Sequence, residues 1–234
     1  MVDIQTGCNC IDNNIGGGIK SDVITLIYGE PETGKSTLAL QCAFNCAAQG
    51  LKVLFVDCDN TFSTKRLSQI AGDRFDEVAE RIVLVKPKDF CEQTTVIDHI
   101  QDYVGKKVGL IIIDTLTSLY GARVCETSSK AFTVNRELNR QLAILAQTVK
   151  ILKIPLIITS QVRSVIEEEQ EAVRPVATRV LKFWADITIV LKPTEIPQTI
   201  KAIVERKHET TPKAVCYIQI VEKGIQDTIL ETNG

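Results

Sequence analysis

The sequence predicts an α/β fold with a mostly parallel sheet, and two observations support this class. From residue 23 to about residue 162, apolar β-branched runs of strand length alternate with longer amphipathic segments, as in parallel strands joined by crossover helices. A glycine-rich motif, G-x-x-x-x-G-K-S, lies between the first of these runs and the first long segment. The length of 234 residues suits one large domain, which we expect to span residues 1–234.

The predicted strands of the parallel part show little alternation of polar and apolar residues, as expected where helices cover both faces of a sheet. In chain order these strands are Val23–Tyr28, Val53–Val56, Arg81–Val85, Gly109–Ile113 and Pro155–Thr159. The amphipathic segments between them predict helices. These helices are Lys35–Gln49, Lys65–Gly72, Cys91–Gly105 and about Thr133–Leu152.

The C-terminal part of the chain has a different sequence pattern, in which short apolar runs are separated by turn-rich stretches that contain prolines. This pattern predicts antiparallel strands that extend the sheet. The predicted strands are Ala185–Leu191, Ile200–Arg206 and Val215–Val221. Before them, Val162–Arg179 opens with an acidic run and is predicted to be a long loop, a kind of segment that is usually functional or disordered.

Composition excludes several classes of protein. With 27 basic against 29 acidic side chains, the chain has no global positive charge, so any contact with nucleic acid would need local patches. The apolar run Leu110–Ile113 is far shorter than the ~20 residues of a membrane span. We expect the eight cysteines to be reduced thiols of a cytoplasmic protein, and we expect no zinc because the chain has no CxxC pair and only two histidines.

The glycine-rich motif covers Gly29, Glu30, Pro31, Glu32, Thr33, Gly34, Lys35 and Ser36, with Thr37 after it. It has a predicted strand before it and a predicted helix after it, which is the context that a phosphate-binding loop requires. Backbone N–H groups and the helix N-terminus can hold phosphate groups, Lys35 can reach the β- and γ-phosphates, and Ser36 can ligate Mg²⁺. A glycine-rich strand-to-helix turn without a ligand is the alternative, but motif and context together favour nucleotide binding.

A second contact to magnesium is predicted at Asp114, which directly follows four apolar residues of a predicted strand. A carboxylate at the end of a neighbouring buried strand can hold water bound to magnesium. An acidic residue there could also merely mark the end of a strand. The phosphate-binding motif in the same chain favours the metal role.

Hydrolysis of a bound nucleotide also requires a group that orients or deprotonates the attacking water. The strand Val53–Val56 ends in a polar run in which Asp59 is the candidate for this role. Alternatively, Asp57, Asp59 and Asn60 could be turn residues that hydrogen-bond locally. Gln161 would lie at the same edge of the sheet, where it could sense a γ-phosphate or simply end a strand.

Together these residues resemble the ATPase core of RecA-type recombinases, and most closely the archaeal RadB group of recombinase paralogues. The resemblance covers nearly the whole chain, and the matching segments are Thr6-Gly7, Gly16–Ile19, Leu26–Glu30, Val56–Phe62, Leu110–Tyr120, Arg140-Gln141, Thr159–Val162 and Glu222–Ile225. It implies a RecA-type P-loop ATPase core, a mostly parallel sheet flanked by helices with C-terminal antiparallel strands. Strand-exchanging archaeal and eukaryotic relatives carry an additional N-terminal helical DNA-binding domain and a linker with a polymerisation hook. We expect neither that domain nor filament formation by that hook here.

Two further departures from the family concern catalysis. Strand-exchanging members have Glu-Gly where this chain has Asp59-Asn60, and the aspartate carboxylate is one methylene, about 1.5 Å, shorter. A misplacement near 1 Å can cost on the order of a hundredfold in rate, so we expect slow hydrolysis. The RadB group has a Lys-His-Arg motif near the C-terminus, whereas here Glu209 follows Lys207-His208. Arg206 or Lys207 could reach a neighbouring subunit's nucleotide as a cationic finger, or could belong to a solvated hairpin.

The resemblance also implies two DNA-facing loops, one within about Gly121–Asn135 and one after Gln161. Lysine and arginine on such loops can neutralise DNA phosphates, and nearby aromatic rings can stack on unpaired bases. Basic residues on loops can also be simply solvated. The candidate DNA-binding residues are Arg123, Lys130, Arg163, Arg174, Arg179 and Lys182.

The resemblance therefore implies an ATP- and Mg²⁺-binding accessory factor of DNA repair and recombination. It implies a weak ATPase that binds single-stranded or branched DNA without strand exchange of its own. Expected partners are the main archaeal recombinase, a Holliday-junction nuclease, and other copies of the chain in a homo-oligomer; no membrane contact is expected. Two alternatives stay open, a KaiC-like signalling ATPase that binds no nucleic acid and a P-loop kinase of a small molecule.

Overall fold

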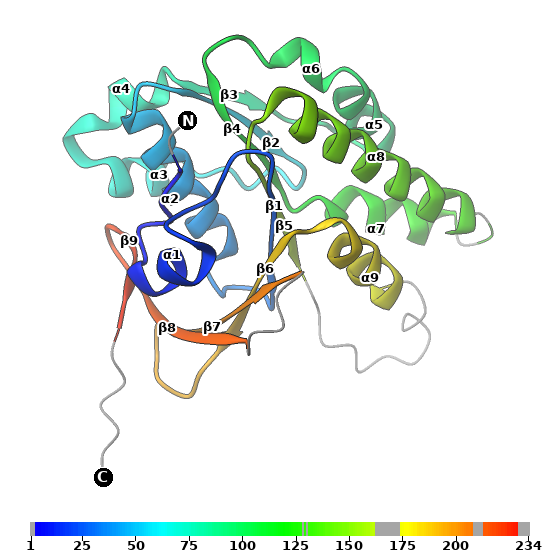
Figure 1. Ribbon diagram of the computed structural model, residues 1–234. Coiled ribbons are helices and arrows are strands. Elements are labelled where there is room, and N and C mark those ends of the chain that lie inside the picture. The colour runs from blue at the N-terminus through cyan, green and yellow to red at the C-terminus, as the bar shows by residue number, and fades with distance from the viewer. Residues whose placement is uncertain (1–2, 128, 130, 162–173, 208–212, 229–234) are drawn as a thin grey trace.

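The computed structural model describes residues 3–127, 129, 131–161, 174–207 and 213–228. Its centre is a nine-stranded sheet with the order β3-β2-β4-β5-β1-β6-β7-β8-β9 (Figure 1). The first six strands of this order are parallel to one another, and β7, β8 and β9 continue the sheet in antiparallel fashion. The strands are β1 Ile24–Gly29, β2 Lys52–Asp57, β3 Ile82–Val85, β4 Val108–Asp114, β5 Leu156–Gln161, β6 Ile187–Pro193, β7 Thr199–Arg206, β8 Ala214–Val221 and β9 Gly224–Asp227.

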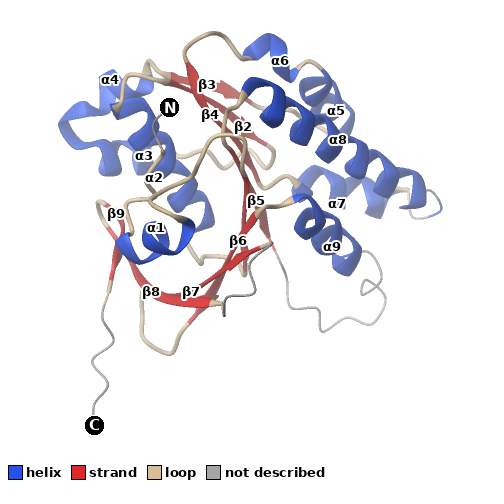
Figure 2. Cartoon of the chain, in the orientation of Figure 1, coloured by secondary structure: helices blue, strands red, loops and turns tan. Residues whose placement is uncertain are grey.

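Helices cover both faces of the sheet, and Figure 2 shows the three layers. One face carries α1 Asn9–Ile15, α2 Lys35–Ala48, α3 Thr64–Ala71, the 3₁₀ turn η1 Gly72–Arg74 and α4 Phe75–Ala79. The other face carries α5 Phe90–Asp98, α6 Ile100–Tyr103, α7 Thr117–Glu126, α8 Ala131–Leu152 and α9 Arg174–Trp184. The predicted α/β class, with a mostly parallel sheet and antiparallel C-terminal strands, is confirmed.

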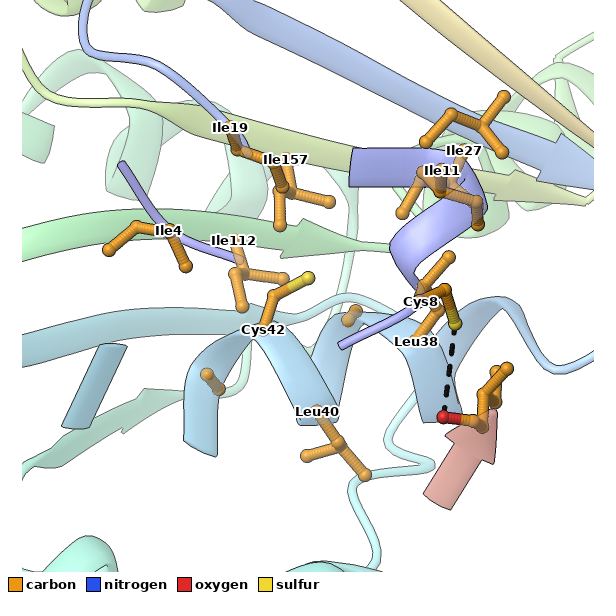
Figure 3. Close-up of a cluster of buried hydrophobic side chains, with 14 of the residues drawn as sticks. Ile4, Cys8, Ile11, Ile19, Ile27, Leu38, Leu40, Cys42, Ile112 and Ile157 are labelled. Atoms are coloured by element: carbon orange, nitrogen blue, oxygen red, sulfur yellow. Dashed lines mark hydrogen bonds between the residues drawn. The ribbon is translucent and has the colours of Figure 1, made fainter. Parts of the chain in front are cut away.

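The hydrophobic core lies in two layers, one on each side of the sheet, and neighbouring strand residues divide between them. Phe55 and Ile112 pack with α2, whereas Leu54 and Ile111 pack under α8. This division follows from the two-residue period of a strand and explains why these strands are apolar throughout. Figure 3 shows the layer on the α2 side, where Ile4 and Ile19 of the N-terminal segment complete the packing.

Three sequence-based expectations about the elements were wrong. Strand β6 pairs in parallel with β1, so the antiparallel part begins only at β7. Residues 174–179 of the predicted long loop belong to α9, in which Ala177 and Leu181 lie one turn apart and are buried. The acidic run before α9 favoured the prediction of a loop, so the helical spacing of the apolar residues after it was not recognised. The rest of the predicted loop, residues 162–173, is outside the described residues. The predicted helix Cys91–Gly105 is divided into α5 and α6 at His99.

The expectation that all cysteines are reduced thiols was also wrong. Cys10 on α1 and Cys216 on β8 form a disulfide, with their Cα atoms 5.9 Å apart. The two residues are 206 positions apart in the sequence, so no local spacing could reveal the pair. The other six cysteines are free thiols. Within the described residues, no helix is both long and apolar enough to cross a membrane.

The N-terminal segment is joined to the antiparallel end of the sheet by polar contacts as well. The Asp227 carboxylate of β9 accepts hydrogen bonds from the first backbone N–H groups of α1, those of Asn9 and Cys10, at 2.6 and 3.1 Å. The Cys8 thiol donates to the carbonyl of Ile225, shown by the dashed line in Figure 3. A carboxylate at a helix N-terminus satisfies donors that have no partner within the helix. The first and last parts of the described chain thus form one unit beside α2.

Candidate nucleotide-binding site

The phosphate loop connects the end of β1 to the start of α2, at the carboxyl edge of the parallel strands. Gly29 has no room for a side chain, because an added Cβ would lie 2.1 Å from the carbonyl oxygen of Leu191 on β6. Gly34, directly before the first residue of α2, has a φ of 85°, a conformation that favours glycine. The Thr33 hydroxyl donates to the Glu30 carbonyl at 2.8 Å. The loop is therefore preformed, with the N-terminus of α2 directed at a phosphate position.

Lys35 is the first residue of α2, and its side chain turns back over the loop. Its ammonium group donates to the carbonyl of Glu30 at 2.5 Å. Burial lowers the pKa of Lys35, and this effect is opposed by the nearby carboxylates, of which Asp114 is the strongest. A lysine held in this way is a positive charge close to the loop that can move to a phosphate oxygen.

Asp114 is the last residue of β4 and is buried beside the start of α2. One of its carboxylate oxygens accepts hydrogen bonds from Ser36 at 3.2 Å and from Thr159 at 2.5 Å. Burial raises the pKa of Asp114 to about 6, and the hydrogen bonds from Thr159 and Ser36 oppose this shift. Thr159 also accepts from the backbone N–H of Thr115 at 2.7 Å. Sequence analysis did not identify Thr159 as a site residue, although a polar residue in a buried strand is a usable signal.

Asp57, at the end of β2, is a second residue that the sequence analysis did not place in the site. It is fully buried and accepts hydrogen bonds from the backbone N–H groups of Thr61 and Phe62 at 3.0 and 2.9 Å. Carboxylate oxygens of Asp57, Asp59 and Asp114 all lie within 4.8 Å of one another. Mg²⁺ prefers oxygen ligands such as these carboxylates and the Ser36 hydroxyl, so this donor set fits the ion.

Seven of the predicted site residues line one hollow at the carboxyl edge of the sheet, which we call the phosphate hollow. Its lining consists of Glu32, Gly34, Lys35, Ser36, Thr37, Asp59, Thr115 and Gln161. Asp59 accepts a hydrogen bond from the Thr61 hydroxyl at 2.6 Å. Gln161 ends β5 opposite Gly29 of β1, which places its exposed side chain beside the phosphate loop. Four strand ends that are distant in sequence thus deliver the predicted groups to one place.

The predicted DNA contacts lie on helices as far as the structure describes them. The first predicted loop, Gly121–Asn135, was wrong as a loop because α7 extends to Glu126 and α8 begins at Ala131. Arg123 on α7 is exposed and forms an ion pair with Glu126 at 3.2 Å. Lys130 and Arg163 are outside the described residues.

On α9, Arg174 is the first residue, and Arg179 and Lys182 are exposed. The Lys182 ammonium lies 4.8 Å from the centre of the Tyr28 ring, a cation–π contact within its own chain. None of these residues lines the phosphate hollow.

Arg206 and Lys207 lie at the opposite edge of the sheet from the phosphate loop. Arg206 pairs with Ile187, the first residue of β6, whereas the loop follows the end of β1. The Lys207 ammonium donates to the carbonyl of Phe183 and lies 5.0 Å from the centre of the Phe183 ring. Neither residue can reach the nucleotide site of its own chain, so a contact with a neighbouring subunit stays a prediction.

Comparison with known proteins agrees with the residues that were quoted for the resemblance. A family model described as Rad51 matches residues 1–228. A DNA repair and recombination protein RadB from Thermococcus onnurineus is 34% identical over 229 residues, which cover 97% of this chain and 98% of that protein. Another from Thermococcus gammatolerans is 33% identical and covers 96% of this chain and 98% of that protein.

The fold comparison gives the same result. A solved structure titled crystal structure of the RadB recombinase superimposes with a TM-score of 0.76 at 30% sequence identity, covering 97% of this chain and all of that one. The RecA-type core, the phosphate loop at the carboxyl edge and these matches over almost the whole length agree with one another. The chain belongs to the Rad51 family of RecA-type proteins and, within it, to the RadB group of DNA repair and recombination proteins.

Proposed function

We propose that this protein binds ATP with Mg²⁺ in the phosphate hollow, hydrolyses it slowly, and acts as an accessory factor of DNA repair and recombination. The observation that carries the proposal is the convergence of Lys35, Ser36, Asp59, Asp114 and Gln161 at one edge of the sheet. Each of these residues has the chemistry that binding or hydrolysis of a nucleoside triphosphate requires.

The residues have separate roles in this proposal. Backbone N–H groups of the loop and the α2 N-terminus hold the phosphates, and Lys35 leaves the Glu30 carbonyl for the terminal phosphates. Ser36 and Asp114 would bind Mg²⁺, and the hydrogen bond from Thr159 would fix the orientation of the Asp114 carboxylate. Bound Mg²⁺ would neutralise charge on the phosphate oxygens.

Asp59 orients the attacking water in this scheme. Its carboxylate is restrained by Thr61, and it is shorter than the glutamate of strand-exchanging relatives. Slow turnover is therefore expected, and ATP would act mainly as a conformational ligand.

Gln161 is proposed to couple the nucleotide to DNA. It lines the phosphate hollow at the end of β5, and Arg163, one of the candidate DNA contacts, follows it by two residues in the chain. A side chain that contacts a γ-phosphate can shift the segment that follows it between two arrangements. Replacing Gln161 by alanine should leave ATP affinity nearly unchanged and abolish the effect of ATP on DNA affinity. If ATP still changed DNA affinity in the Gln161→Ala variant, this coupling would be wrong.

The first experiment is fluorescence-anisotropy binding to single-stranded and branched DNA, with and without ATP and Mg²⁺, together with ATP turnover on the same sample. Nucleotide-dependent binding that weakens steeply with salt, with slow turnover, supports the proposal. A lack of DNA binding at low salt would instead favour a signalling ATPase. Release of ADP only in the presence of a small acceptor would favour a kinase. Co-purification with the main recombinase or a junction-cleaving nuclease would test the proposed partners.

A further inference from the structure

Lys86 directly follows β3 and reaches into the acidic cluster at the carboxyl edge of the sheet. Its ammonium group lies 3.6 Å from the Asp57 carboxylate and donates a hydrogen bond to the side-chain oxygen of Asn60 at 3.0 Å. These two partners flank Asp59 in the sequence, one on each side. Nothing in the sequence pattern pointed to Lys86, because its role depends on the pairing of β3 with β2.

The strand register explains how Lys86 reaches this position. Val85, the last residue of β3, is paired with Val56 of β2 in parallel, so the next residues of the two strands are Lys86 and Asp57. A parallel pair keeps equivalent positions side by side where both strands end. The register of β3 and β2 therefore places Lys86 next to Asp57.

The electrostatic role of Lys86 follows from the crowding of negative charge. Asp57 is fully buried, and its carboxylate lies within 4.8 Å of those of Asp59 and Asp114. A buried carboxylate among like charges needs a positive partner as well as hydrogen bonds. In the described part of the chain, Lys86 is the one cation that forms an ion pair with Asp57. The partly exposed ammonium of Lys86 therefore offsets part of the negative charge at Asp57, while Lys35 lies near Asp59 and Asp114.

The geometry of the turn gives Lys86 a second role. Asn60 has a φ of 59°, in the left-handed region, which costs energy for a residue with a side chain, so contacts from the surroundings are needed to hold the backbone directly after Asp59. The bond from Lys86 to the Asn60 side chain holds this residue from the neighbouring strand. The Thr61 hydroxyl, one residue further along, donates a hydrogen bond of 2.6 Å to the Asp59 carboxylate.

We propose that Lys86 is a positioning residue for ATP hydrolysis, which holds the Asp57–Thr61 turn so that the Asp59 carboxylate stays directed into the phosphate hollow. This inference rests on the proposed ATPase function and adds a residue that follows β3, a strand that does not border the phosphate loop. Lys86 acts through Asp59 and does not line the phosphate hollow itself.

The test compares Lys86→Met, Lys86→Arg and the control Lys88→Met, which removes an exposed lysine two residues further along. Lys86→Met should lower kcat about tenfold to a hundredfold, as expected for a displacement of a catalytic group by about 1 Å, and should change the affinity for a fluorescent ATP analogue less than twofold. Lys86→Arg should restore kcat to within about threefold, because the guanidinium can make both contacts. Lys88→Met should behave as the wild type.

A double-mutant cycle shows whether Lys86 acts through Asp59. In an Asp59→Asn background, Lys86→Met should cause almost no further loss of rate, because the group that Lys86 positions has already been removed. An equal loss of rate in both backgrounds would overturn the proposal. It would also be overturned by wild-type kcat in Lys86→Met, by failure of the arginine variant to restore kcat, or by a loss of ATP affinity that parallels the loss of rate.

A measurement without turnover separates this inference from the proposed function. The amide protons of Thr61 and Phe62 are bonded to Asp57 and should exchange with solvent at least tenfold faster in Lys86→Met than in Lys88→Met. Equal exchange in the two variants would refute the positioning of the turn. Absence of ATP turnover in the wild-type protein would refute the proposed function, and with it the catalytic consequence of the turn.

Discussion

Reduction of the disulfide between Cys10 and Cys216 is expected to destabilise the protein strongly. The cysteines are 206 positions apart, and cross-linking a loop of that length removes enough entropy from the unfolded chain to stabilise the fold by about 5 kcal/mol. In a domain of this size, such a change corresponds to roughly 10–20 °C in Tm. Local unfolding of the reduced protein should begin at α1, because the connection of α1 to the antiparallel strands would then depend on the Asp227 hydrogen bonds and on packing.

The assay is thermal unfolding of the oxidised protein with and without dithiothreitol, with mass spectrometry to count the free thiols. A Cys10→Ser variant should melt at the temperature of the reduced protein and should not respond to dithiothreitol. Cys91→Ser is the matched control, because Cys91 is an exposed free thiol and its removal should leave the response intact. Coincident melting curves for the oxidised and reduced protein would refute the stabilisation derived from loop closure.

Three further predictions concern the phosphate loop, the helix that follows it and Asp114. The folded-state pKa of Asp114 is raised from 3.8 to about 6, so this group stabilises the metal-free fold below pH 4 relative to neutral pH, and that stability is lost as the pH rises through 6. Asp114→Asn should therefore be more stable than the metal-free wild type at pH 7 by up to about 3 kcal/mol, a difference that should vanish near pH 4 in denaturant titrations with a chelator. Gln41→Ala should cost at least about 2 kcal/mol in the same assay, since the buried carbonyl of Thr6 and the buried N–H of Ile225 lose their hydrogen-bond partner and the Ile225 carbonyl keeps only the Cys8 thiol, and a cost below 1 kcal/mol would contradict this. Gly29→Ala should abolish ATP binding in a calorimetric titration, because its Cβ would meet a backbone oxygen of β6 at 2.1 Å, and retained binding would show that β6 can move.

Much of the site could be predicted because its residues follow strands that are recognisable as apolar runs. The carboxyl ends of parallel strands meet at one edge of a sheet, so a polar residue after such a run has a predictable location. Asp114 and Gln161 were found in this way, Lys35 and Ser36 were found from the glycine-rich motif, and all four lie together. Thr159 was missed because it lies inside a strand, where a hydroxyl has no distinctive pattern.

The C-terminal half of the chain was harder to predict. Strand β6 and the strands after it have similar composition, and their directions depend on which neighbours they pair with. Helix α9 follows an acidic run that favoured a loop, but its apolar side packs against α8 and β1. Tertiary packing decides such short amphipathic segments more often than local preference does.

By itself, the sequence determined the α/β class, the phosphate loop with its strand-to-helix context, and the carboxylates and amide that accompany it, because each depends on residues close together in the chain. Only the tertiary structure decided three other features. These are the disulfide between α1 and β8, the contacts of Gln41 with both Thr6 and Ile225, and the contact of Lys86 with the turn around Asp59. All three join segments that are distant in sequence, and strand order and register set their distances, so no local pattern could encode them.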